Sequence, residues 1–176
     1  MNTTRLPDAM PDVSSPTLLV VCDTHHCRLF DVGGHTIVEK EALESREPVF
    51  TDRQDRKPGP SAFGGKGGSM MGVGETDQVD EHRLKEFANA LVKHLETLVR
   101  TQKIGEVHLS APAKFLSVLR THLTGMLQDV TEQTIDGNFV KQAPLDILLR
   151  FRPDLGEALQ KLRDQENFSP RKLPPK

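Results

Sequence analysis

The stretch Leu18-Leu19-Val20-Val21-Cys22 is a continuous apolar run that ends at Asp23-Thr24, two residues typical of turns. Five apolar residues in a row indicate a strand that is buried on both faces, as in the centre of a sheet. A second strand is predicted over residues 27–32 and a third over residues 35–40, with Gly33-Gly34 as the hairpin turn between them. These three strands are expected to form an antiparallel meander.

Helical periodicity dominates the second half of the chain. Apolar residues at three- and four-residue steps predict a long amphipathic helix that ends at Gly105. These residues are Leu84, Phe87, Ala88, Leu91, Val92, Leu95, Leu98 and Val99. We then expect a strand over residues 106–110, a helix that starts at Pro112, a strand over residues 129–135 and a helix that starts at Pro144. The helix after Pro112 is expected to bury Phe115, Leu116, Leu119, Leu123, Met126 and Leu127.

The order of these elements predicts the fold class. It is α/β, with a mixed five-stranded sheet in which an antiparallel meander is followed by βαβ units, flanked by helices. Residues 1–15 are expected to form a disordered tail, and residues 16–152 one α/β domain with a long Gly-rich loop at 43–79. Residues 153–176 are expected to form a weakly helical, Pro-rich tail whose helix packs weakly or not at all.

Composition narrows the class of protein further. The chain has 176 residues, a formal net charge of −2 and only two cysteines. This charge excludes a polybasic protein that coats nucleic acid but permits a local basic patch. Two cysteines cannot build a disulfide framework, and residues 1–8 lack the apolar centre of a secretory signal. We therefore expect a cytoplasmic protein without membrane insertion, and the oligomeric state stays open.

Two sequence blocks resemble the bacterial host attachment protein family. Residues 107–123, VHLSAPAKFLSVLRTHL, show a strand that ends in Ala-Pro, an aromatic-Leu pair and then Leu-Arg. Residues 20–30, VVCDTHHCRLF, resemble the start of that family, and the similarity extends over roughly residues 17–150. That family is in turn similar to the middle domain of archaeal and eukaryotic peptide-chain release factors. The resemblance implies a mixed five-stranded sheet with flanking helices.

The release-factor resemblance also draws attention to the long loop. In release factors, a loop after the third strand carries Gly-Gly-Gln into the ribosomal peptidyl-transferase centre. This chain has Gly64-Gly65-Lys66-Gly67-Gly68 there, so the glycines are present and the glutamine is missing. A second departure is Gly137-Asn138-Phe139, where family members commonly show Lys-Asp-Leu. We therefore expect no catalytic residue and no peptidyl-tRNA hydrolysis by the release-factor route.

The Gly-rich loop is also the candidate binding site on its own chemistry. Residues 53–72 contain four basic residues and one acidic residue in a chain that is otherwise acidic. Freed backbone N–H groups beside cationic side chains suit phosphates or an RNA backbone, whereas the pattern of a nucleotide-binding P-loop is missing. The predicted binding residues are Arg53, Arg56, Lys57, Gly64, Gly65, Lys66, Gly67 and Gly68. The alternative is a solvated insertion without a partner.

Two further motifs have simpler interpretations. Cys22-Asp-Thr-His-His-Cys27 brings two thiols and two imidazoles together, but adjacent residues of a turn point apart and suit tetrahedral zinc poorly. We expect no metal and no other cofactor, with Cys22 and Cys27 as small core residues and the histidines solvated. Ser110 and Pro112 follow a strand and are expected to cap and start the next helix.

The leading functional prediction is a translation-associated binding module. Its basic Gly-rich loop would contact ribosomal RNA or the tRNA backbone, which makes the ribosome or tRNA the expected partner. The alternative is a protein-interaction factor that is indirectly required for host or surface attachment and has no catalytic activity. A third reading, a hydrolase of peptidyl-tRNA, depends on a chemistry other than that of the missing glutamine.

Overall fold

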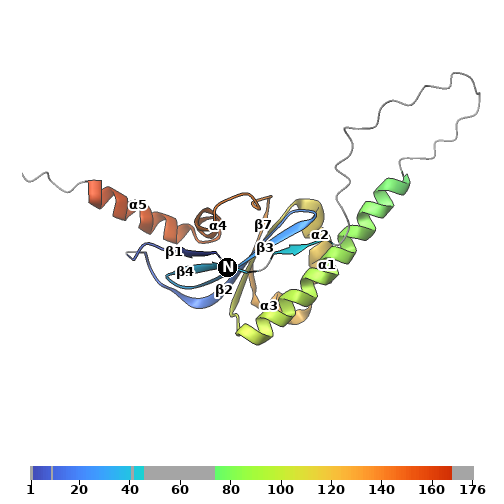
Figure 1. The fold of residues 1–176 in the computed structure, drawn as a ribbon, viewed down its shortest axis with the longest axis horizontal. Helices are drawn as coiled ribbons and strands as arrows, with labels where there is room; N and C mark the ends of the chain where they lie inside the picture. The colour runs from blue at the N-terminus through green and yellow to red at the C-terminus, as the bar shows by residue number, and fades with distance from the viewer. Residues whose placement is uncertain (1, 9, 41, 46–73, 168–176) are drawn as a thin grey trace, which may run out of the picture.

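The computed structural model describes residues 2–8, 10–40, 42–45 and 74–167 (Figure 1). The strands are β1 (Thr3–Arg5), β2 (Val13–Cys22), β3 (His26–Gly34), β4 (Thr36–Glu39), β5 (Leu43–Glu44), β6 (Glu106–Ala111) and β7 (Thr131–Asp136). The helices are α1 (Gly74–Gln102), α2 (Ala113–His122), α3 (Gly125–Val130), α4 (Pro144–Phe151) and α5 (Pro153–Asn167). These elements confirm the predicted α/β class with a mixed sheet.

The sheet has seven strands in the order β1-β4-β3-β2-β6-β7, and β5 pairs separately with β3. β2 lies in the middle, where it runs antiparallel to β3 and parallel to β6. β7 then pairs parallel to β6 at the edge of the sheet. The meander and the two crossovers are therefore present as predicted. The sheet has two strands more than expected but is only one strand wider, because β4 and β5 pair with different parts of the same strand, β3.

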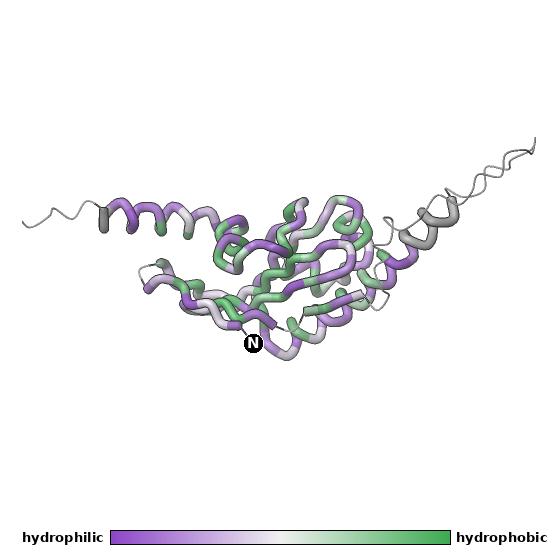
Figure 2. Tube along the Cα trace, turned by 45° about the horizontal axis from the view of Figure 1, so that its top comes forward, coloured by the Kyte–Doolittle hydropathy of each residue, from purple (hydrophilic) through white to green (hydrophobic). Residues whose placement is uncertain are grey.

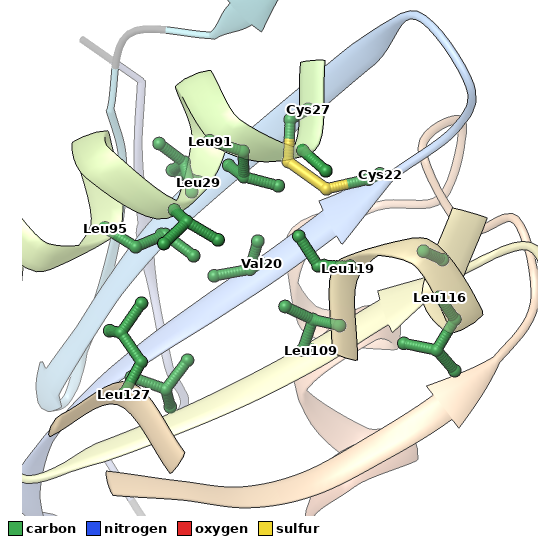
Figure 3. Packing of buried hydrophobic residues seen from close by; sticks show 14 of the residues in the cluster. Val20, Cys22, Cys27, Leu29, Leu91, Leu95, Leu109, Leu116, Leu119 and Leu127 are labelled. Carbon is green, nitrogen blue, oxygen red and sulfur yellow. A yellow bond between two sulfur atoms is a disulfide. The ribbon is translucent and has the colours of Figure 1, made fainter. Parts of the chain in front are cut away.

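The apolar run of β2 is explained by helices on both faces of the sheet. Leu18, Val20 and Cys22 pack with α1, α2 and α3, whereas Leu19 and Val21 pack with α4 and the first turn of α5. The close view in Figure 3 shows Val20 among leucines from α1, α2 and α3. Fully burying one such side chain contributes roughly 1.5–3 kcal/mol, so this strand anchors both layers. Figure 2 shows the apolar residues concentrated in the central strands and in the helices against them.

The amino-terminal residues differ from the predicted disordered tail. β1 pairs antiparallel with β4, and Leu6, Met10 and Val13 are buried. The spacing of these three residues, four and then three positions, is helical, but Pro7 and Pro11 interrupt it, so the apolar pattern predicts neither a strand nor a helix there. The strand itself has only three residues, which is shorter than any sequence window can detect.

The helical layer also differs in detail from the prediction. The expected single helix after Pro112 is divided into α2 and α3, because Leu123 and Thr124 adopt extended backbone conformations between them. Asp129 and Val130 belong to α3, so β7 begins later than the strand that was predicted from residue 129. The apolar residues of α2 and α3 follow nearly the same helical periodicity on both sides of this break. Their spacing therefore does not reveal that the helix is divided.

Residues at both ends of the predicted loop 43–79 belong to regular elements. Leu43 and Glu44 form β5, and α1 begins at Gly74. β5 has two residues, and the first turn of α1 lacks the apolar spacing on which a helix prediction depends. Residues 46–73 lie outside the described part of the chain.

The carboxy-terminal helix is longer and better attached than the predicted tail. α5 has 15 residues, with Leu155 fully buried and Leu159 partly buried against the cluster under α4. Beyond this contact, α5 extends away from the sheet, on the side opposite to the start of α1 (Figure 1). The first turns of α5 are therefore packed against the body, which the predicted tail did not include.

Candidate functional site

All eight predicted binding residues lie in the segment 46–73, outside the described residues. The structure describes the two elements that flank this segment, β5 before it and α1 after it; we call these two elements the frame of the segment. β5 pairs with β3 at Cys27↔Leu43, and the N–H of Ser45 donates to the carbonyl oxygen of His25 at 2.8 Å. On the other side, α1 begins at Gly74. The described elements on either side of this segment are therefore a two-residue strand and the longest of the described helices.

The turn between β2 and β3 lies beside this frame. The Oδ1 atom of Asp23 accepts hydrogen bonds from the backbone N–H groups of His25 and His26, at 2.7 and 2.6 Å. The same carboxylate lies 3.5 Å from Nδ1 of His26. Within the described ranges, no group of three or more side chains could hold a metal ion. The turn is thus organised by Asp23, and its histidines lie at least partly exposed.

Cys22 and Cys27 form a disulfide, which corrects the prediction of two unlinked core residues. Both are fully buried, as predicted, and they are direct partners in the register of β2 and β3. Figure 3 shows the bond beneath α1, close to Leu91. The two residues flank a four-residue turn, and this hairpin spacing was the sequence signal that could have revealed the pairing.

Ser110 does not cap α2, contrary to the prediction. Its hydroxyl donates to the carbonyl oxygen of Gly137 at 2.9 Å, and the N-cap position is Pro112, which makes no side-chain cap bond. The N–H of Gly137 in turn donates to the carbonyl oxygen of Ala111 at 3.1 Å. Ser110 therefore joins the end of β6 to the loop that follows β7.

The loop over residues 137–143 is fixed by two arginines. Nη1 of Arg28 donates to the carbonyl oxygens of Val140 and Gln142, at 2.6 and 3.0 Å. The guanidinium of Arg150 lies 4.4 Å from the centre of the Phe139 ring. That ring packs so closely on Gly137 that a Cβ there would lie 2.5 Å from it. The departure Gly137-Asn138-Phe139 is thus a packed structural unit of this chain.

His108 is a buried titratable group that the sequence analysis missed. The residue is 2% exposed, and its ring stacks on Phe151 with centroids 5.2 Å apart. Neither ring nitrogen has a hydrogen-bond partner among the described residues. Burial lowers the pKa of His108, against an opposing effect of Glu106. His108 occupies a buried strand position that an apolar residue would ordinarily fill, and no sequence motif indicates that a histidine is buried there.

These features define a mixed-sheet α/β protein that carries a long inserted segment between its meander and its first crossover helix. The chain belongs to the family described as "Protein required for attachment to host cells", whose sequence pattern matches residues 18–151. This confirms the family resemblance drawn from the two sequence blocks. No curated protein matches the chain significantly. Among the described residues, no helix is long and apolar enough to cross a membrane.

Proposed function

We propose that this protein is a translation-associated binding module that contacts ribosomal RNA or the tRNA backbone through the segment 53–68. The observation that carries the proposal is the local charge: residues 53–72 contain four basic residues and one acidic residue, whereas the whole chain has a net charge of −2. Arg53, Arg56, Lys57 and Lys66 would neutralise phosphates, and the glycines would permit close backbone approach.

The frame of the segment supports this proposal. α1 is packed into the core through Leu84, Phe87 and Leu91, and β5 is paired to β3 beside the Cys22–Cys27 disulfide. A binding segment whose two ends are fixed loses less conformational entropy on binding than a free tail does. The resemblance to release factors points the same way, since their corresponding loop enters the ribosome. Lys66 in place of glutamine makes contact, and not hydrolysis, the proposed activity.

Ribosome co-sedimentation with two charge-matched variants tests the proposal. In the first variant, Arg53, Arg56, Lys57 and Lys66 are replaced by Gln. In the control variant, four exposed cations of the described surface are replaced by Gln: Lys93, Arg100, Lys141 and Lys161. We expect the first variant to lose ribosome binding at physiological salt and the control to retain it. Equal binding by all three proteins would contradict the proposal.

The family description carries the second candidate, a protein-interaction factor indirectly required for host or surface attachment. Affinity capture with and without RNase separates the two functions. Partners that disappear after RNase treatment support the RNA-contacting module. Protein partners that persist after RNase treatment support the interaction factor. Release of labelled peptide from peptidyl-tRNA on stalled ribosomes would instead assign a hydrolase.

A further inference from the structure

His108 lies between the sheet and α4 in an environment that suits only a neutral ring. Its side chain is 3% exposed, and neither nitrogen finds a hydrogen-bond partner among the described residues. The ring of Phe151 covers it at an interplanar angle of 16°. A neutral imidazole buried without partners already costs free energy, and an imidazolium buried in the same place costs considerably more.

Three charged residues lie near His108, one on β6, one on β7 and one between α4 and α5, and none of them forms a hydrogen bond with its ring. Oε2 of Glu106, on β6, lies 4.0 Å from Nε2 of His108 and is itself partly exposed. Glu132, on β7, acts in the same direction as Glu106 but more weakly. Arg152, between α4 and α5, acts against protonation and donates to both carboxylate oxygens of Asp154, at 2.9 and 2.8 Å.

The remaining elements packed against His108 add no compensating charge. β2, which pairs with β6 at Leu19↔His108, contains no ionisable side chain apart from its disulfide-bonded cysteine. In α4, Asp146 is exposed, and the guanidinium of Arg150 lies over Phe139. The closed structure therefore offers the imidazolium the partly exposed carboxylate of Glu106, 4.0 Å from Nε2, and a weaker attraction to Glu132, and the cation of Arg152 opposes both.

The pKa of His108 is accordingly lowered, first by burial and then by Arg152, with Glu106 and Glu132 opposing. A solvated His ring takes up its proton below about pH 6.5. We call the described structure the closed form, and a form in which α4 is detached from the His108 ring the open form. In the open form, the exposed His108 ring binds a proton in a pH range in which the buried ring of the closed form does not. Acidification consequently favours the open form, and neutral pH favours the closed one.

We propose that His108 is an acid-sensitive latch, whose protonation releases α4 and the first turn of α5 from the sheet. Phe151 and Leu155 belong to the same buried cluster as Ile147 and Leu148, so these side chains leave together. Loss of the Phe151 contact uncovers the apolar face of α4. α5 moves with α4, because Leu155 provides its fully buried contact with the body.

Hydrogen exchange between pH 7.5 and 5.0 tests the latch in the full chain. After correction for the intrinsic pH dependence of exchange, we expect protection of residues 144–155 to fall below about pH 6.5. One linked proton sets the steepest fall at about tenfold per pH unit. The amides of α1 serve as the internal reference and keep their protection over the same range. A uniform response of α1 and α4, or no response of α4, would overturn the proposal.

Two variants assign the response to His108. His108→Phe keeps a stacking ring and removes the titration, so its residues 144–155 should show no pH-dependent loss of protection. His82→Gln removes an exposed histidine of α1 and should respond like the wild type. Direct NMR titration of the His108 ring in the wild type is independent of how well either variant folds. A ring pKa at or above 6.5, or a His108→Phe protein that opens like the wild type, contradicts the latch.

Discussion

The guanidinium of Arg28 connects parts of the sheet and loop that are far apart in the sequence. It donates to Glu39 on β4 at 2.7 Å and to the carbonyl oxygen of Val140, which is 112 residues further along the chain. Its side chain is only 21% exposed, so these hydrogen bonds are shielded from competing water. Arg5 forms a comparable pair with Asp8 at 2.8 Å, but both side chains are more than 70% exposed.

Replacing these two arginines should therefore have unequal effects. We expect Arg28→Ala to lower the free energy of unfolding by about 2–3 kcal/mol, because half-buried acceptors lose a charged donor. Arg5→Ala should cost less than about 1 kcal/mol, as exposed ion pairs do. Urea denaturation of both variants measures the difference. Equal costs would show that the contacts of Arg28 do not stabilise the loop over residues 137–143.

The predictability of single residues depended on whether a side chain follows a pattern. Val20 and Leu91 could be assigned to the core because each continues an apolar run or stripe. His108 interrupts such a run with a polar ring, and only the stacking on Phe151 shows how it is accommodated. The Cys22–Cys27 disulfide follows from the register of β2 and β3, which places the two cysteines directly opposite each other.

Elements with strong periodicity were predicted well, and short ones were not. β2, β3, β6, α1 and α4 follow from apolar runs, apolar stripes or a proline at the first helical position. β1 and β5 have three and two residues and depend on pairing with β4 and β3. Such strands are determined by tertiary contacts, so no local pattern encodes them. The candidate site itself stays a prediction, because its residues lie outside the described ranges.

The attachment of α5 makes a prediction at the scale of the element. Leu155 is fully buried and Leu159 is only partly buried, although both are leucines on the same helix. Leu155→Ala should lower the free energy of unfolding by about 2–4 kcal/mol, because it leaves a cavity under α4. Leu159→Ala should cost about 1 kcal/mol or less. Thermal or urea unfolding of the pair checks this order, and a larger cost at Leu159 would contradict the described docking of α5.

At the scale of the whole molecule, the fold separates a packed body from the segment proposed to bind RNA. Helices cover both faces of the sheet, and the two hydrophobic clusters bury most of the apolar residues of the described elements. The proposed function assigns the phosphate contacts to four basic residues outside this body. The body and the segment should therefore be separable by substitution: changing the four cations should alter binding without altering the stability of the fold.

The salt dependence of RNA binding measures this central claim most directly. Affinity for ribosomal RNA is determined over a series of salt concentrations for the wild type and for the variant with Gln at positions 53, 56, 57 and 66. If the four cations each neutralise a phosphate, the slope of log affinity against log salt should become shallower by about 3 in the variant. An unchanged slope with unchanged affinity would contradict the account.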